Sequence, residues 1–333
     1  MNRSRARPYR FDQGTAAERA AYEDSEDSTM TAQHVVFGAS GGIGNAVIRE
    51  LAHQGQPVRG VNTTGRAIVP PDVELVAGDA TNLDDVRRVL KDADVVYQCL
   101  FPAVQDAIIE VVAETGATLV VANNLYMYDP TQGPMSENSP HAYGERTGGK
   151  FYAQMGEQAI AAHQDGRIKA TVGQASDIYG PNVRHGIGRD QVFSRLMAGK
   201  AANVVGDPDT IHTYTYADDC ARALITLGQD PQALGRTWHL PSAEPITTRA
   251  LLTMICDELG VDSKIRAANG IPLTVMAWFS QTMRNLKQEK VYQFTSPWLV
   301  DHSRYEQAFG IDVTPHPEAV KQTVAWFKEN PNP

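Results

Sequence analysis

The sequence has few cysteines: only Cys99, Cys220 and Cys256 occur among its 333 residues, and they lie far apart. An odd, dispersed set of thiols fits neither a disulfide framework nor a metal cluster, so we expect no metal and a reducing, cytoplasmic location. No apolar run approaches the length of a membrane span, which predicts a protein that does not bind membranes. The net charge of −9 argues against non-specific binding to nucleic acid.

The first 30 residues differ in composition from the rest of the chain. Residues 1–8 are basic and residues 22–28 are acidic, and no apolar segment typical of a secretory signal separates them. We therefore expect residues 1–30 to form a disordered N-terminal tail. Met30 directly precedes the first predicted strand and is a candidate for the true start of the folded unit. The alternative is a functional tail that covers a site or bridges subunits.

Residues 34–44 join a short apolar run to three regularly spaced glycines, Gly38, Gly41 and Gly44. A helix-compatible segment, residues 45–54, follows at once. In such a unit the first glycine permits a tight turn, the second lets the backbone approach a pyrophosphate, and the third lets the helix pack closely. Free N–H groups at the helix start then face the anion. The stretch predicts a dinucleotide-phosphate cradle, with an ordinary glycine-rich turn as the alternative.

Valine-rich runs alternate with helical stretches through the first half of the chain. Further strands are expected at 57–62, 73–77, 94–99, 117–122 and 167–172, with helices at 84–90 and 104–114. This pattern predicts an α/β fold: a Rossmann-type doubly wound parallel sheet with a smaller, mostly helical C-terminal substrate lobe. We place the NAD(P)-binding domain at 31–180, with a return segment at about 211–240, and the substrate-binding lobe at 181–210 and 241–330.

Ligands of doubly wound sheets lie beyond the carboxyl ends of the strands. The predicted cofactor-binding residues are therefore those at and just after these ends: Gly38, Ser40, Gly41, Gly42, Ile43, Gly44, Asn62, Thr63, Arg66, Asp79, Ala80, Leu100, Asn123 and Ala175. The second strand is followed by hydroxyls and by Arg66, and by no acid that would bind a ribose 2′-hydroxyl. A guanidinium pairs well with a 2′-phosphate, so the sequence favours NADPH, with NADH second.

Two of these predicted cofactor-binding residues could instead have purely structural roles. Arg66 could be a solvated loop residue rather than a phosphate ligand. Asp79, expected against the adenine amino group, could instead start the next helix, as could Thr81 or Asn82.

The order of motifs resembles the extended short-chain dehydrogenase/reductase family, in its NAD-dependent epimerase/dehydratase branch. The resemblance extends over roughly residues 33–328 and is carried by residues 38–44, 78–79, 93–97, 176–181 and 212–219.

The catalytic signature of that family is altered in this sequence. Aligning residues 127–128 with the family's Val-Tyr puts Asn124 where the family has a catalytic Ser or Thr. If Lys150 is the lysine of the family's Tyr-x-x-x-Lys pair, the tyrosine position holds Arg146. Tyr143 precedes Lys150 by two helical turns rather than one, so it cannot make the same contact.

A ketone that receives a hydride develops an alkoxide, which the family's tyrosine protonates, so another proton source is needed here. We expect Asn124, Tyr126 and Lys150 to form the catalytic group. Asn124 would hold the carbonyl oxygen, Tyr126 would hold it or supply the proton, and Lys150 would bind the nicotinamide ribose. His141, water or an acidic hydroxyl of the substrate are other donors, and Arg146 could orient an anion.

These residues also have structural readings. Asn123 and Asn124 would then bond only to loop backbone, Tyr126 would line the pocket, and Arg146 and Lys150 would form a solvated helix face.

Other side chains are expected to be structural. Tyr128 and Tyr179 look like core residues, and residues 218–219 are expected to cap a helix at 220–227. Large apolar side chains of the C-terminal part suit either the core of that lobe or a flat aromatic ligand: Met276, Trp278, Phe279, Met283, Tyr292, Phe294 and Trp298.

Atypical members of the resembled family lack the Tyr-x-x-x-Lys pair, and this sequence is similar in kind to the simocyclinone (angucyclinone) type of ketoreductase from antibiotic pathways. The resemblance implies NAD(P)H-dependent reduction of a ketone on a bulky, polycyclic aromatic polyketide, a hydrophobic small-molecule substrate. The alternatives are a non-catalytic NADP(H)-binding sensor or regulator and a nucleotide-sugar epimerase or dehydratase. Two glycines, residues 148–149, would disturb the start of a helix through which the family often pairs, so monomer and homodimer both stay open.

Overall fold

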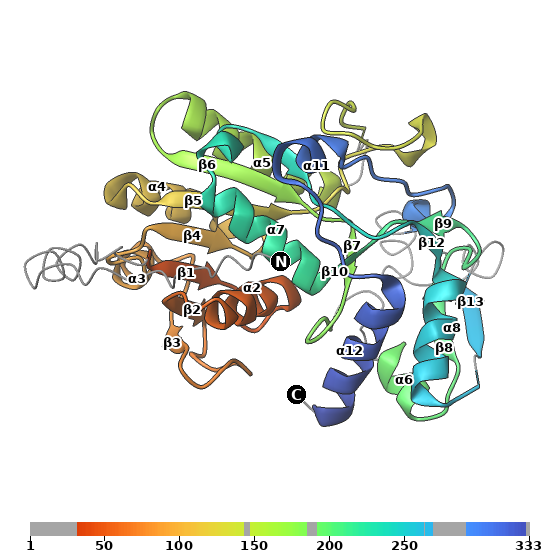
Figure 1. Ribbon diagram of the computed structural model, residues 1–333. Helices are drawn as coiled ribbons and strands as arrows, with labels where there is room; N and C mark the ends of the chain where they lie inside the picture. Colours follow the sequence, from red (N-terminus) through yellow and green to blue (C-terminus); the bar gives the residue numbers. More distant parts are fainter. Residues whose placement is uncertain (1–31, 143–146, 185–191, 263, 269–290, 331–333) are drawn as a thin grey trace, which may run out of the picture. The chain divides into compact units, whose positions relative to one another are not determined.

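The computed structural model describes residues 32–142, 147–184, 192–262, 264–268 and 291–330. Seven parallel strands form one sheet in the order β11-β6-β5-β4-β1-β2-β3 (Figure 1). Strand order reverses beside the central β1, which is the mark of a doubly wound Rossmann sheet, so the predicted fold class is confirmed. The strands are β1 (His34–Phe37), β2 (Val58–Asn62), β3 (Glu74–Ala77), β4 (Val95–Gln98), β5 (Thr118–Asn123), β6 (Lys169–Gln174) and β11 (Thr237–His239).

Both faces of the sheet are covered because alternate strand residues point to opposite sides. Val36 of β1 belongs to a core shared with helices α2 (Gly42–His53) and α7 (Ala217–Gln229). Its neighbours Val35 and Phe37 belong to a second core. The helices of that core are α3 (Leu83–Val89), α4 (Gln105–Thr115) and α5 (Thr147–Gln164). Strands with apolar residues on both sides are what the continuous valine-rich runs predict.

The strands predicted from the sequence are all present, with ends that differ by no more than two residues. Helix α2 begins at Gly42, three residues before the predicted start, because the last two glycines of the loop already have helical backbone. Strand β11 lies inside the predicted return segment and pairs with β6 through Thr237–Val172 and its neighbours. Its three residues are too few to give a period of their own in the sequence.

The remaining described elements form three two-stranded pairs and several helices. Strand β10 (Tyr214–Tyr216) pairs with β7 (Asp177–Tyr179), β9 (Ile211–His212) with β12 (Ile246–Thr247), and β8 (Ala202–Val205) with β13 (Ile265–Ala268). The helices are α6 (Phe193–Met197), α8 (Thr248–Leu259), α11 (Ser303–Phe309) and α12 (His316–Glu329), and the 3₁₀ turns are η1 (Pro102–Val104), η2 (Pro130–Gln132), η4 (Pro231–Ala233) and η5 (Val291–Phe294).

The sequence also predicts helices at 186–200, 248–259 and 320–327 in the C-terminal half of the chain. Helix α8 matches the predicted span, and α12 begins four residues before the predicted start. The predicted helix at 186–200 is described only from residue 192, where α6 covers five residues. Residues 1–31 and residues 271–286, which include Met276, Trp278, Phe279 and Met283, lie outside the described residues.

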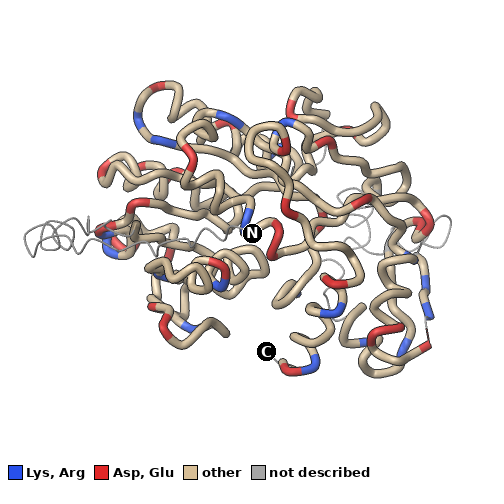
Figure 2. The backbone as a smooth tube through the Cα atoms, in the orientation of Figure 1, with Lys and Arg blue, Asp and Glu red and all other residues tan. Residues whose placement is uncertain are grey.

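Side chains of both charges are interspersed along the described chain (Figure 2). Within those residues, no helix combines the length and the apolar character needed to cross a bilayer.

Candidate active site

The glycine loop between β1 and α2 is shaped for a phosphate. Gly38 has φ +90°, and a Cβ there would lie 2.6 Å from the Cys99 carbonyl oxygen. A Cβ on Gly44 would collide with the Gly38 carbonyl oxygen. Ser40 and Gly41 are exposed, and Gly41 is the N-cap residue of α2. The loop therefore leaves the first N–H groups of α2 accessible to an anion, and the residues present fit a dinucleotide.

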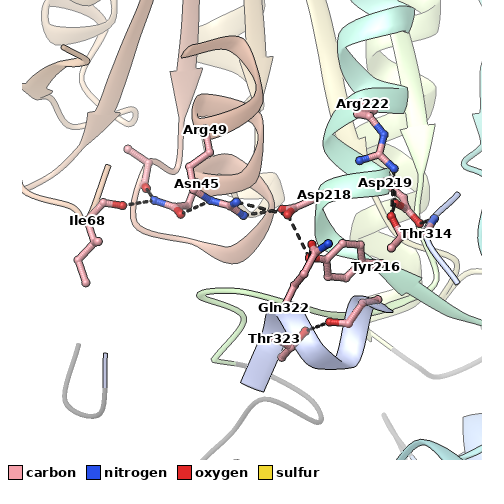
Figure 3. Close-up of polar contacts among 12 residues, drawn as sticks. Asn45, Arg49, Ile68, Tyr216, Asp218, Asp219, Arg222, Thr314, Gln322 and Thr323 are labelled. Carbon is pink, nitrogen blue, oxygen red and sulfur yellow. Dashed lines mark hydrogen bonds and ion pairs between the residues drawn. The ribbon is translucent and has the colours of Figure 1, made fainter. Parts of the chain in front are cut away.

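Asn45 holds a second loop against this cradle. Its buried side-chain Nδ2 donates to the carbonyl oxygens of Ile68, at 2.7 Å, and Ala39, at 3.4 Å (Figure 3). On the other side, the Asn182 Nδ2 donates to the Ser40 carbonyl oxygen at 3.2 Å. The cradle is thus fixed by two asparagine side chains from different parts of the chain.

The turn after β2 is organised by Asn62. Its Oδ1 accepts hydrogen bonds from the backbone N–H groups of Thr64, at 3.1 Å, and Arg66, at 3.3 Å, and its Nδ2 donates to the Arg66 carbonyl oxygen. Asn62 is therefore engaged with the turn itself, while Thr63 and Arg66 are exposed. The turn leaves the Arg66 guanidinium at the surface beside the end of β2.

The turn after β3 shows whether Asp79 caps the next helix, α3. Asn82 is the N-cap residue of α3 and accepts from the N–H groups of Asp84 and Asp85. Asp79 is exposed and accepts from the Thr81 N–H and hydroxyl, and these two bonds lower the pKa of its carboxyl. Asp79 thus shapes the turn without capping the helix.

The predicted apolar cofactor residues differ in exposure. Ala80 and Ala175 are buried, whereas Ile43 and Leu100 are half-buried and Gly42 packs against Val183.

Two asparagines at the end of β5 bond to backbone. The Asn123 Nδ2 donates to the Tyr152 carbonyl oxygen at 2.9 Å, and its Oδ1 accepts from the Asn124 N–H at 2.8 Å. The Asn124 Oδ1 accepts from the Tyr126 N–H at 3.0 Å. Asn123 thus bonds to backbone through both its amino group and its amide oxygen, and Asn124 through its amide oxygen. The Asn124 amino group is the part that has the chemistry to donate to a substrate oxygen.

Tyr126 is joined to two acid–base residues that sequence reasoning left without a role. Its hydroxyl donates to Asp177 Oδ1 at 3.1 Å, and Asp177 Oδ2 lies 3.1 Å from His212 Nε2. Burial raises the pKa of Tyr126 well above its usual value, and the neighbouring Asp177 charge raises it further. Tyr126 is therefore a protonated phenol at neutral pH.

Two more phenols lie against Tyr126. The Tyr152 ring meets it edge-on at 6.0 Å between ring centroids, and the Tyr292 hydroxyl donates to the Tyr126 carbonyl oxygen at 3.1 Å. Tyr126, Tyr152 and Tyr292 are all half-buried. A cluster of partly accessible phenols thus follows the carboxyl end of β5.

Helix α5 presents small residues on its buried side at this point. Gly149 and Ala153, one helical turn apart, are both buried, whereas Lys150 is exposed. Tyr143 and Arg146 lie outside the described residues. His141 lies 3.1 Å from Glu157 and meets the Tyr128 ring edge-on. The contacts described for Tyr126 thus do not bring it together with Lys150 or His141.

Several aromatic residues of this region belong to the core. Tyr128 is buried and donates to Gln174 Oε1 at 3.0 Å, and Tyr179 is buried with its hydroxyl 2.8 Å from His316 Nδ1. Trp298 is fully buried and donates to Ser176 Oγ at 3.0 Å. Phe294 is half-buried and stacks on His212 at 4.8 Å between ring centroids. Of these rings, only Phe294 retains accessible surface.

The prediction that residues 218–219 cap a helix is corrected by the structure. Helix α7 begins at Ala217 with Tyr216 as N-cap residue, so both aspartates lie in its first turn. Asp218 pairs with Arg49 of α2, and Asp219 binds Arg222 and Thr314 (Figure 3). Their side chains connect α7 to its neighbours instead of capping it.

Part of the chain matches a known protein family. Residues 38–171 match the model of a family described as NAD(P)H-binding. The chain is 20% identical over 296 residues to 3beta-hydroxysteroid-dehydrogenase/decarboxylase isoform 2 of Arabidopsis thaliana. That alignment includes 77% of this chain and 52% of the plant protein, so the chain spans about half the length of this curated relative.

Solved structures with the same fold cover nearly the whole chain. The dTDP-glucose 4,6-dehydratase of Bacillus anthracis in complex with NAD matches with TM-score 0.73 and 15% identity over 90% of this chain and 97% of the dehydratase. An epimerase of Methanothermobacter thermautotrophicus matches with TM-score 0.75 and 15% identity over 90% and 93% of the two chains. The UDP-glucuronic acid 4-epimerase of Bacillus cereus, in complex with UDP-glucuronic acid and NAD, matches with TM-score 0.72 and 15% identity over 89% and 99%. At such identities the likeness establishes the fold, and the family match marks an NAD(P)H-binding domain within it.

Proposed function

We propose that this protein is an NAD(P)H-dependent oxidoreductase that reduces a ketone of a bulky, polycyclic aromatic substrate and prefers NADPH. The observation that carries the proposal is the half-buried, protonated phenol of Tyr126, soon after β5. The carboxyl ends of parallel strands meet at one edge of a sheet, so this phenol and the glycine loop after β1 belong to the same edge. A nicotinamide cofactor bound by that loop would supply the hydride.

The chain's own residues would serve the oxygen of the reacting carbonyl. Negative charge develops on this oxygen as the ketone is reduced. Tyr126 has a proton to give it, and the Asn124 amino group can donate a hydrogen bond to it. Neither role needs Lys150 beside the phenol, and Lys150 keeps the role of a candidate ribose ligand.

The preferred cofactor follows from the turn after β2. No carboxylate stands there to hold a ribose 2′-hydroxyl, and Asn62 is occupied with the turn backbone. The exposed Arg66 guanidinium suits a 2′-phosphate, with which it can form two parallel hydrogen bonds.

The phenol cluster of Tyr126, Tyr152 and Tyr292, with the half-buried ring of Phe294, supports a flat aromatic substrate of polyketide type. Aromatic rings offer both stacking surface and hydroxyl groups, which match a ligand that is itself polycyclic and phenolic.

A second candidate is a nucleotide-sugar epimerase or dehydratase. The structural neighbours favour it, because enzymes with those activities share this fold over almost the whole chain. Such a reaction begins with removal of a proton from a sugar hydroxyl, and a phenol that its raised pKa keeps protonated at neutral pH is not available as that base. The Tyr126 environment therefore favours net reduction of a ketone.

Turnover of purified full-length protein separates the candidates. A ketoreductase consumes NADPH in proportion to a polycyclic aromatic ketone, an epimerase or dehydratase converts a nucleotide sugar without net consumption, and a sensor binds NADPH without turnover. Tyr126→Phe should lower ketone reduction by roughly 10²-fold or more, as loss of a general acid does. Tyr179→Phe removes another buried hydroxyl, bound to His316, and is the matched control. Absence of NADPH oxidation with every polycyclic ketone or quinone would disprove the reductase.

A further inference from the structure

Asp177 stands between Tyr126 and a buried histidine, His212. The His212 ring stacks on the rings of Phe294 and Trp298, with centroid distances of 4.8 and 5.9 Å, and the Tyr214 ring lies 4.5 Å away. The His212 Nε2 lies 3.1 Å from Asp177 Oδ2. The stacked rings define the plane of the imidazole, and the hydrogen bond to Asp177 selects the ring orientation in which Nε2 meets the carboxyl.

The surroundings of the other ring nitrogen select the tautomer. Within the described part of the chain, the buried His212 Nδ1 has no hydrogen-bond partner. A buried N–H without an acceptor is costly, whereas a bare nitrogen lone pair can be left without a donor at lower cost. His212 is therefore best accommodated as the neutral tautomer that carries its proton on Nε2 and donates it to Asp177.

Asp177 is then held by donors on both carboxyl oxygens. Oδ1 accepts from the Tyr126 hydroxyl and Oδ2 accepts from His212 Nε2. The Asp177 side chain nevertheless keeps 20% of its surface exposed, while His212 has none. Of Asp177 and His212, Asp177 is therefore the residue that can exchange a proton with solvent.

We propose that Asp177 is the residue that exchanges the proton of Tyr126 during turnover, and that His212 positions the Asp177 carboxyl for this exchange. The inference rests on the proposed redox function and extends it. A phenol that gives its proton to a substrate must recover one before the next cycle. Asp177 accepts the Tyr126 hydroxyl at hydrogen-bond distance, and its carboxyl can return that proton.

The proton balance is as follows for reduction of a ketone. The carboxylic acid form of Asp177 gives its proton to the Tyr126 oxygen while Tyr126 gives its own proton to the substrate oxygen. The carbonyl carbon takes hydride, so a ketone, a reduced nicotinamide and one proton become an alcohol and an oxidised nicotinamide. Asp177 is left as a carboxylate that accepts the Tyr126 hydrogen bond, as in the structure, and regains a proton from solvent. Oxidation of the alcohol runs through the same groups in reverse.

If Asp177 exchanges the proton, the rates of ketone reduction and alcohol oxidation should depend on pH in opposite ways. Reduction needs the carboxylic acid form of Asp177 and declines as the pH rises, whereas alcohol oxidation needs the carboxylate and increases. Among the described residues, the titratable groups around Asp177 and His212 include Tyr126, Tyr152 of α5, Tyr292 of η5 and Tyr214 of β10. Phenols ionise only at alkaline pH, so these four do not produce a limb of the profile in the acid and neutral range.

Kinetics of variants test the exchange directly. Asp177→Asn keeps an oxygen that can accept from Tyr126 but cannot carry the proton. We expect kcat to fall by about 10²-fold with KM changed only a few-fold, and the pH limb to disappear. His212→Gln retains an N–H donor toward Asp177, whereas His212→Phe retains only the stacked ring. His212→Gln should therefore lose less kcat than His212→Phe. Wild-type kcat and an unchanged pH profile in Asp177→Asn would overturn the proposal.

A second measurement uses the cofactor-free protein, so it is independent of the proposed function. With ¹³C-labelled tyrosine ring carbons, NMR titration should show a lower pKa for Tyr126 in Asp177→Asn than in the wild type, because a neighbouring negative charge is removed. Imidazole ¹⁵N shifts should show the His212 proton on Nε2. An unchanged Tyr126 titration, or a proton on Nδ1, would overturn the arrangement. If turnover is absent with all substrates, the redox function fails, and these spectra still decide whether Tyr126, Asp177 and His212 form one hydrogen-bonded chain.

Discussion

Arg49 of α2 and Asp218 of α7 form a two-pronged ion pair, although 169 positions separate them in the sequence (Figure 3). Their side chains are 28% and 18% exposed. Arg49 Nε also donates to the Asn45 Oδ1, and the Tyr216 hydroxyl lies between Asp218 and Gln322 of α12. Side chains thus connect the helix that starts at the glycine loop to the last helix of the chain.

Replacing Asp218 by Asn should destabilise the protein through this pair. The change leaves the partly buried Arg49 without its carboxylate, for a loss of roughly 1–3 kcal/mol in the free energy of unfolding. Urea unfolding of the wild type and the variant measures the loss. Asp209→Asn breaks the exposed Arg249–Asp209 pair and serves as the control. Equal stability of Asp218→Asn and the wild type would mean that the α2–α7 pair makes no net contribution.

The sequence predicts α2 and α7 as elements but not this connection between them. The glycines and the apolar period mark the helices, since both are local signals. Arg49 and Asp218 carry no signal of pairing, because an arginine and an aspartate on two amphipathic helices are ordinary surface residues. The pair exists because the sheet packs α2 and α7 against the same face.

Gly38→Ala should lower both stability and cofactor affinity. Its φ of +90° disfavours a side chain, and a Cβ would also meet the Cys99 carbonyl oxygen at 2.6 Å. Gly55→Ala is a matched control, because Gly55 has φ +69° but open space where the alanine methyl group would stand. We expect the control to cost about 1 kcal/mol from backbone strain alone and Gly38→Ala to cost more. Thermal unfolding and calorimetric titration with NADPH measure the two effects.

Comparing the two glycine variants also separates the cost of backbone strain at positive φ from the cost of a steric clash at the added Cβ. If Gly38→Ala is no less stable than Gly55→Ala and binds NADPH as the wild type does, the close approach of the Gly38 and Cys99 backbones has no functional consequence.

Arg66→Ala should weaken NADPH binding selectively. Loss of a charge-assisted contact to the 2′-phosphate would reduce NADPH affinity by about tenfold or more and leave NADH affinity nearly unchanged. Titration of wild type and variant with both cofactors gives the ratio. Arg59 and Arg249 are unsuitable controls because each is ion-paired, with Glu74 and Asp209, so Arg167→Ala, at an exposed position just before β6, is used. An equal loss for NADH and NADPH would exclude a 2′-phosphate contact.

In the candidate site, the sequence predicts the residues that lie at the carboxyl ends of the strands but not the side-chain contacts around them. Asn124 and Tyr126 follow β5 directly, so their position is a consequence of strand order. Asp177 follows β6 by the same logic, but the residues around it form no acid–base pattern that would single it out. His212 has no such signal. It reaches Asp177 because its strand β9, which pairs with β12, leads directly into β10, and β10 pairs with β7, the strand that begins at Asp177.

His34 predicts how the stability of the fold depends on pH. The ring is fully buried in β1, stacked on Tyr97 with its Nδ1 3.3 Å from the Tyr97 hydroxyl. Burial lowers the pKa of His34 from 6.5 to about 4, against a smaller opposing effect of Asp94. The unfolded chain therefore binds a proton at higher pH than the native state does. The free energy of unfolding should fall as the pH drops from about 6.5 toward 4, by up to about 3 kcal/mol.

His34→Phe retains a stacked ring and removes the titration. Urea unfolding at intervals between pH 7 and pH 4 should show a slope smaller than that of the wild type by up to one proton, or about 1.4 kcal/mol per pH unit. His53→Gln, at the exposed end of α2, controls for loss of a surface histidine. Because protonation of His34 would place a charge inside the sheet that carries the glycine loop, the same variant should extend cofactor binding to lower pH. Identical slopes for His34→Phe and the wild type would show that the acid sensitivity of the fold arises elsewhere.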